Sequence, residues 1–358
     1  MNDTAPALAG RVAPLDGLRA VSILLVILHH LKGTVGAPAL LGRVADAMDA
    51  GNLGVRVFFV ISGFLITGLL TRELSRRGTI SLRTFYWRRT LRIFPPAYLF
   101  LGVLALLGVA GLLRLTGRDL VAGVTYTMNF YLGAFTPDQW QVGHLWSLAV
   151  EEQFYLLWPA VLLLAGVRRA AWLAVSLMVV VPMLRVASLF GELPAPVAVV
   201  SPFLLHADWL AAGCVLALGV QWLRRAPSYQ RVRATSWWTC LLAASALAAW
   251  NAFGHWRTRE LTSVWTVLAV ALLIDQLAHE TGPWAVRALA LPPVAWIGRV
   301  SYSLYLWQEL FCNRYATDWW TRYPLNVVLA FAAATLSYYG VERPVLAWRD
   351  RSRHAQTV

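Results

Sequence analysis

Long apolar segments separated by short basic connections run along almost the whole chain. A helix needs about 20 consecutive, mostly apolar residues to cross a bilayer, and ten segments approach that length. The pattern predicts an all-α integral membrane protein, with residues 1–358 forming a single transmembrane domain. The expected spans are residues 15–33, 52–71, 97–115, 145–166, 170–190, 203–222, 237–253, 261–279, 295–313 and 324–342.

The composition supports a membrane protein, and it changes how the net positive charge of the chain is interpreted. Hydrophobic residues make up 58% of the chain and charged residues 14%, with a mean hydropathy of +0.57. Soluble domains have about 45–50% and about 25%, respectively. A net charge of +13 would suggest nucleic acid as the partner of a soluble protein, but here the positive-inside rule explains it. We therefore expect membrane lipids, and no nucleic acid, as partners.

The distribution of basic residues predicts the orientation. Most arginines outside the spans lie in connections that would face one side, such as residues 72–92 and 343–353. Cytoplasmic loops carry an excess of Lys and Arg, so both termini are expected in the cytoplasm. Three cysteines, Cys214, Cys240 and Cys312, are too few for a disulfide framework or a metal cluster, and no metal is expected.

The first span carries ionisable residues that a simple anchor would not need. It contains Asp16, Arg19, His29 and His30, and each such group costs about 2.5–3.5 kcal/mol near the bilayer centre. Arg19 and His30 are separated by three helical turns plus roughly 20°, which places them on one face, roughly 16 Å apart along the axis. His29 points about 100° away from His30.

A cluster of arginines precedes the third span in the segment RRTLRIFPPAY, residues 88–98. Arg88, Arg89 and Arg92 either hold this loop on the cytoplasmic side or form a cationic pocket, because guanidinium groups suit phosphate. Pro95-Pro96 is expected to stop the amphipathic helix before the span begins.

Polar residues recur at helical spacing in the fourth and ninth spans. Ser147, Glu151 and Tyr155 form one stripe, and a buried acid such as Glu151 needs a partner, for which Arg19 or a histidine is expected. Glu151 belongs either to a structural ion pair or to a reactive site. In the ninth span Ser301, Tyr305 and Gln308 recur similarly, with Glu309 adjacent.

These residues leave two kinds of function open. The chain shows no phosphate-binding glycine loop, dinucleotide-binding fingerprint or zinc spacing. A buried histidine with an arginine on its face suits a general base acting on a hydroxyl, and it also suits a proton-coupled carrier.

Six sequence motifs follow one another along nearly the whole chain. They are LDGLRAVSILLVILHH, FFVISGFLIT, RRTLRIFPPAY, HLWSLAVEEQFYLLWP, GRVSYSLYLWQELF and YYGVERP, and the first contains Arg19 and His30 in an Arg-x10-His arrangement. Together, and in this order, they resemble the acyltransferase-3 family of bacterial membrane acyltransferases, which O-acylate sugars and related molecules.

The resemblance implies an O-acyltransferase of the bacterial cytoplasmic (inner) membrane. Its co-substrate would be an acyl-CoA, and acetyl-CoA is the acyl-CoA expected. The acceptor would be a carbohydrate or glycolipid of the cell envelope, or a related exported molecule. His30 would deprotonate the acceptor hydroxyl, Arg19 would orient the donor, and Glu151 matches a family position. Arg88, Arg89 and Arg92 would lie near the CoA phosphates. Secondary site residues are His144, Ser147, Tyr155, Tyr305 and Gln308.

Two departures from the family pattern and two other functions bear on this hypothesis. Gln308 stands where many members have a histidine, so no second base is expected there. We also expect no extracytoplasmic hydrolase-like domain of the SGNH type in this chain.

A transporter or flippase of a glycan or lipid is the main alternative function, and a membrane sensor or scaffold is a third possible function. The acceptor, the length of the acyl group and the oligomeric state remain open.

Overall fold

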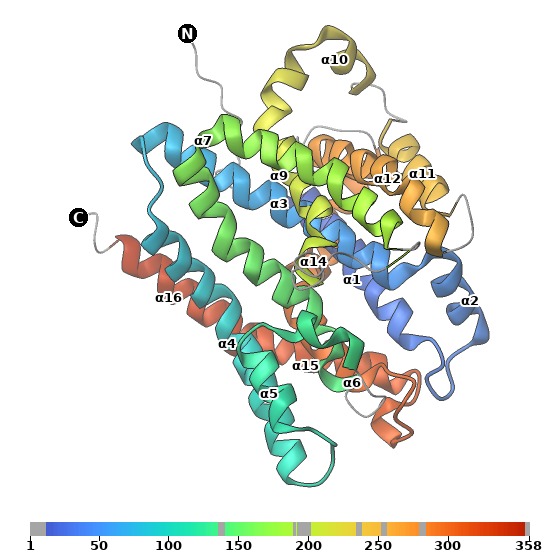
Figure 1. Cartoon of the computed structure of the whole chain (residues 1–358). Helices are drawn as coiled ribbons and strands as arrows, with labels where there is room; N and C mark the ends of the chain where they lie inside the picture. The colour runs from blue at the N-terminus through green and yellow to red at the C-terminus, as the bar shows by residue number, and fades with distance from the viewer. Residues whose placement is uncertain are drawn as a thin grey trace.

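The computed structural model describes residues 12–134, 140–188, 191, 202–233, 238–251, 256–278 and 284–354. Within these ranges the chain forms helices and no strand, which confirms the all-α prediction (Figure 1). The longer elements are α1 (Ala13–Leu31), α3 (Ala50–Arg77), α4 (Leu82–Val109), α7 (Leu145–Ala187), α9 (Ala207–Arg225), α11 (Trp238–Asn251), α12 (Trp256–Leu277), α14 (Pro292–Phe311) and α15 (Leu325–Ser337). The shorter ones are α2 (Ala39–Met48), α5 (Gly117–Val124), η1 (Met128–Ala134), α6 (Trp140–Gly143), α10 (Pro227–Arg233), α13 (Trp284–Leu289), η3 (Trp319–Thr321), η4 (Tyr338–Glu342) and α16 (Arg343–His354).

Five helical segments of the described chain are long and apolar enough to cross a membrane. They are Ala13–Leu31, Ala50–Arg77, Leu82–Val109, Trp140–Ala187 and Leu325–Arg351. The fourth contains two of the predicted spans, because α7 turns at Gly166, where φ is 77° and ψ is 163°. Residues with a side chain avoid this conformation, so glycine allows the bend. Figure 1 shows the two arms of α7 diverging from it.

Contacts between helices fix their relative directions. Helices α1 and α14 run parallel, and α3 runs antiparallel to both. The first arm of α7 and α9 run in the direction of α3, whereas α4 runs against α7. The contact pairs that establish this are Gly298 with Asp16, His30 with Glu309, Gly54 with Ser22, Gly51 with His29, Phe59 with His206, Gly63 with Leu210, Ser62 with Glu151, Thr67 with Trp158, Arg89 with Tyr155 and Tyr86 with Leu156.

The expected helix stop at Pro95-Pro96 is wrong. Helix α4 begins at Leu82, where Ser81 caps it by accepting a hydrogen bond from the Thr84 N–H, and it continues through both prolines to Val109. Prolines are tolerated in membrane helices because neighbouring helices can satisfy the disturbed backbone. Pro95 and Pro96 remove the N–H donors to the Leu91 and Arg92 carbonyls, and the Tyr302 hydroxyl of α14 donates to the next carbonyl, that of Ile93, at 2.8 Å. The arginine segment is thus part of the same helix as the span that follows.

Glycines allow the closest helix contacts. A Cβ on Gly298 would lie 1.7 Å from the Asp16 carbonyl oxygen, and one on Gly63 would lie 2.0 Å from the Leu210 carbonyl oxygen. Small residues let membrane helices approach each other in this way. The first contact brings α1 against α14, and the second brings α3 against α9, so both fix the helices that carry the site.

Candidate active site

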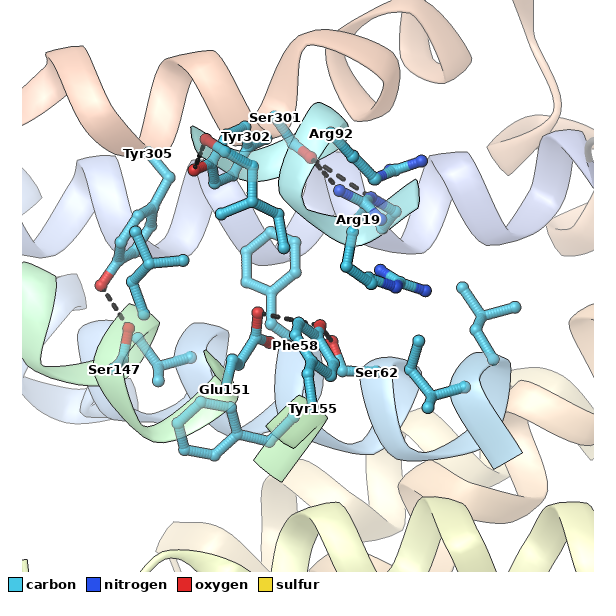
Figure 2. Close-up of a pocket in the computed structure, with 17 residues that line it drawn as sticks. Arg19, Phe58, Ser62, Arg92, Ser147, Glu151, Tyr155, Ser301, Tyr302 and Tyr305 are labelled. Atoms are coloured by element: carbon cyan, nitrogen blue, oxygen red, sulfur yellow. Dashed lines mark hydrogen bonds between the residues drawn. The ribbon is translucent and has the colours of Figure 1, made fainter. Parts of the chain in front are cut away.

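A cavity of about 130 Å³ lies between α1, α3, α4, α7 and α14. Its charged lining consists of three arginines, Arg19, Arg89 and Arg92, and one carboxylate, Glu151, so the lining carries a net positive charge. Figure 2 shows Arg19 and Arg92 toward one end and the Ser147–Tyr305 pair toward the other. The other polar lining residues are Ser62, Ser147, Tyr155, Ser301, Tyr302 and Tyr305.

The arginines reach the cavity from two helices. Arg19 donates to the Ser301 Oγ atom from Nε at 3.3 Å and from a terminal nitrogen at 3.2 Å. The Arg89 guanidinium lies over the Tyr155 ring, 4.8 Å from its centroid. Of the three arginines expected near CoA, Arg89 and Arg92 line the cavity and Arg88 does not. An interval of three residues keeps Arg89 and Arg92 on one side of α4.

Glu151 binds hydroxyl groups. Its carboxylate accepts a hydrogen bond from Ser62 Oγ at 2.8 Å and another from the Tyr155 hydroxyl at 3.2 Å, which also lies 3.0 Å from Ser62 Oγ. The expectation that Arg19 or a histidine would be the partner of Glu151 is therefore wrong, because its hydrogen-bond partners are hydroxyl groups. Arg19 stays near enough to interact with the charge of Glu151. The stripe of Ser147, Glu151 and Tyr155 is confirmed, because all three line the cavity.

Ser62 is a site residue that the sequence analysis did not identify. The signal was weak, because a serine between glycines is common where membrane helices pack closely. Only the approach of α7 to α3 brings Ser62 against Glu151.

A pair of hydroxyls closes the other end of the cavity. Ser147 Oγ and the Tyr305 hydroxyl are 2.5 Å apart. The Tyr305 hydroxyl donates to the His144 carbonyl oxygen at 2.6 Å. A phenol has one proton to donate, so Ser147 is the donor to Tyr305. These two secondary candidates thus connect the cavity with His144, a third.

Two histidines meet one carboxylate just beyond this pair. His30 Nδ1 lies 3.6 Å from Glu309 Oε1, and His144 Nδ1 lies 2.6 Å from Glu309 Oε2. The backbone N–H of His144 donates to Glu309 Oε2 at 3.1 Å. Glu309 also lies at the N-terminus of α7, where the helix dipole favours a negative charge. The described residues contain no group of three His, Cys, Asp or Glu side chains placed to hold a metal ion.

The predicted distinction between the two histidines of α1 is confirmed. His30 faces Glu309 on α14, and Arg19 faces Ser301 on the same helix. His29 instead packs against α3, where a Cβ on Gly51 would lie 2.7 Å from its ring. However, His30 is not among the residues that line the cavity. The Ser147–Tyr305 pair lies at the end of the cavity nearest to His144 and Glu309.

Gln308 does not belong to either cluster. Its side chain is fully buried, and it is not among the cavity lining. Its neighbour Glu309 occupies the position that meets the histidines, four residues after Tyr305. That spacing, the same as between Glu151 and Tyr155, was the available signal for Glu309.

Two other acids in the apolar segments, Asp208 and Asp275, form structural ion pairs. Arg185 binds Asp208 through two hydrogen bonds of 2.9 and 2.6 Å. Arg224 forms an ion pair with Asp275, which also accepts a hydrogen bond from the Tyr229 hydroxyl at 2.8 Å. All three cysteines are free thiols.

The helices and the cationic cavity define a membrane protein with a buried polar site. The family model described as an acyltransferase domain matches residues 12–341. The chain therefore belongs to the acyltransferase-3 family. No solved structure matches the chain.

Three similar proteins from different bacteria carry descriptive names. "Putative O-acetyltransferase SAR0937" of Staphylococcus aureus strain MRSA252 is 28% identical over 94% of this chain and 58% of its own length. "Putative peptidoglycan O-acetyltransferase YrhL" of Bacillus subtilis strain 168 is 28% identical over 94% of this chain and 55% of its own length. "Peptidoglycan O-acetyltransferase OatA" of Listeria monocytogenes is 26% identical over 93% of this chain and 56% of its own length. The chain thus spans little more than half the length of these relatives.

Proposed function

We propose that the protein is a multi-pass O-acetyltransferase of the bacterial inner membrane, with ten spans and both termini in the cytoplasm. It would move an acetyl group from cytosolic acetyl-CoA to a hydroxyl of a cell-envelope carbohydrate. The observation that carries the proposal is the cavity in which three arginines face a single carboxylate. A site with excess guanidinium groups suits a phosphorylated ligand.

The order of the groups along the helices supports a donor end and an acceptor end. Arg19 lies near the start of α1 and His30 near its end, roughly 16 Å further along the axis. In the proposed orientation the arginines are nearer the cytoplasm and His30 is nearer the outer side. The long arm of CoA between its phosphates and its thioester suits this separation.

The reaction assigns a role to each end. Arg19, Arg89 and Arg92 would bind the phosphates of the donor. His30 would accept the proton of the acceptor hydroxyl as the oxygen forms a bond to the thioester carbonyl carbon. The carbon–sulfur bond then breaks, and the proton passes from His30 to the sulfur of the departing CoA. A positioned imidazole accelerates such a step by about 10²–10⁴-fold.

The names of the relatives support the acetyl group and the envelope carbohydrate, and two of those names specify peptidoglycan. Membership of an acyltransferase family does not favour the transporter or flippase that the sequence left open.

The test is transfer by the purified protein in lipid vesicles. Labelled acetyl-CoA is added on one side and peptidoglycan fragments on the other, and acetylated hydroxyls and released CoA are measured together. We expect ester formation in equal amount to CoA release. Movement of the glycan across the vesicle membrane without CoA release would instead assign a carrier function.

A further inference from the structure

Three buried polar groups from separate parts of the chain converge beyond the cavity. They are His30 on α1, His144 at the start of α7 and Glu309 on α14, with side chains 16%, 2% and 11% exposed. A carboxylate in such a place is costly unless other groups stabilise it. Two histidines and a helix N-terminus do so here, which indicates that the site is built around an ionised Glu309.

The two oxygens of Glu309 have different surroundings. Oε2 accepts the backbone N–H of His144 at 3.1 Å and lies 2.6 Å from the Nδ1 atom of the same residue. Oε1 lies 3.6 Å from His30 Nδ1. His144 therefore holds the carboxylate from one side, and the other oxygen is directed at the imidazole of His30.

This arrangement determines which nitrogen of His30 can act as a base. A neutral imidazole has one N–H and one lone pair, and the hydrogen bond made by one nitrogen sets the state of the other. A carboxylate facing Nδ1 favours the proton on Nδ1, and the lone pair on Nε2 then remains for the acceptor hydroxyl. The negative charge of the Glu309 carboxylate also stabilises the imidazolium that forms when Nε2 takes the proton.

We propose that Glu309, held by His144, is a positioning residue that orients His30 and selects its Nδ1–H tautomer for acyl transfer. This inference rests on the proposed function, in which His30 is the base. The distance of 3.6 Å is longer than a hydrogen bond. Catalytic contacts are often long in the absence of substrate and shorten in the productive complex.

His144 also connects this cluster to the donor cavity. Its carbonyl accepts a hydrogen bond from Tyr305, which in turn is bound to Ser147 in the cavity wall. The His144 backbone thus donates its N–H to Glu309 and accepts, at its carbonyl, a hydrogen bond from Tyr305 in the cavity wall. The distance between donor and base is fixed through this residue, so Glu309 belongs to the site rather than to the general packing.

The experiment compares Glu309→Gln with wild-type protein in the acetyl-CoA assay in vesicles. The amide keeps the shape of the side chain and removes the charge. We expect kcat to fall by about 10²-fold or more, as when the acid behind a catalytic histidine is replaced by an amide. We expect KM for acetyl-CoA to stay within about twofold, because the arginine cavity is unchanged. The matched control is Glu342→Gln, a buried acid that accepts a hydrogen bond from Ser303 and should leave kcat unchanged.

A double-mutant cycle separates positioning from a structural role. If Glu309 acts through His30, Glu309→Gln should reduce kcat far less in a His30→Ala background than in the wild type, because residues that act as a unit are not additive. An equal loss in both backgrounds, or a wild-type kcat in Glu309→Gln, overturns the inference.

Glu309→Asp provides a second variant if the amide does not fold. It keeps the charge on a shorter side chain, so kcat should be reduced at unchanged KM, again with little further loss in the His30→Ala background. A wild-type kcat or an equal loss in both backgrounds would overturn the inference. Full activity of His30→Ala would instead show that the proposed base is wrong, whatever the behaviour of Glu309.

Discussion

Arg19 donates two hydrogen bonds to Ser301, a residue 282 positions later in the chain. This contact joins the first helix to α14 and sets the register in which the two run parallel. The same register places His30 opposite Glu309. The donor end and the histidine end of the proposed site therefore depend on one helix–helix contact.

The close contact between α1 and α14 predicts an effect of a single methyl group. Gly298→Ala should lower the melting temperature and the transfer rate, because the new Cβ would lie 1.7 Å from the Asp16 carbonyl oxygen. Overpacking of this kind costs about 1–3 kcal/mol. The control is Gly102→Ala on α4, where nothing lies within 4 Å. Thermal unfolding in detergent measures both, and equal stability of the two variants would contradict the prediction.

The cavity arginines should control donor affinity. Replacing Arg89 or Arg92 with Gln should raise KM for acetyl-CoA by about 10-fold or more, since a hydrogen bond to a charged group contributes about 1.5–3 kcal/mol. Arg92→Lys should recover only part of the affinity, because an ammonium lacks the planar fork of a guanidinium.

The matched control for the arginines is Arg83→Gln. Arg83 lies on the same helix, is exposed and does not line the cavity. The KM of the Arg83→Gln variant for acetyl-CoA should therefore match that of the wild type. If Arg89→Gln and Arg92→Gln also keep the wild-type KM, the arginines serve only to orient the chain in the membrane.

The two adjacent histidines should differ strongly. His30→Ala should lower kcat by about 10²–10⁴-fold, the usual contribution of a general base, with donor binding retained. His29→Ala should cost far less activity, because His29 packs against α3 and not against Glu309. A larger loss in His29→Ala than in His30→Ala would show that the faces were assigned wrongly.

The hydrogen bonds of Glu151 should appear in stability as well as in activity. Glu151→Gln removes the charge that Ser62 and Tyr155 bind, and a lost hydrogen bond to a charged group costs about 1.5–3 kcal/mol. We expect a lower melting temperature and a kcat between those of the wild type and His30→Ala. Adding Ser62→Ala should cost little more, because the partner is already changed. Fully additive losses would show that the two residues act independently.

The proposed orientation can be tested at Arg83, which is exposed at the start of α4. A single cysteine at this position, in a chain whose three cysteines are replaced, should react with a membrane-impermeant reagent only after the inner face is opened. Labelling in intact cells would reverse the orientation and place the donor end outside.

The sequence by itself determined the class of the protein and most of its helices. Apolar length, buried charges and the spacing of Arg19 and His30 need no knowledge of neighbouring helices, because the helical repeat is local. The motifs were also enough to suggest the family. The passage of α4 through Pro95-Pro96 was not determined in this way, since the accommodation of prolines in a membrane helix depends on the helices packed around it.

The tertiary structure alone decided which polar groups meet. Glu151 has Ser62 and Tyr155 as its hydrogen-bond partners, and Glu309, rather than the adjacent Gln308, lies against the two histidines. The spacing within a helix gives the direction of a side chain but not the identity of the residue opposite. That identity depends on the register between helices. Close contacts between residues far apart in the sequence, such as Gly298 and Asp16, set this register.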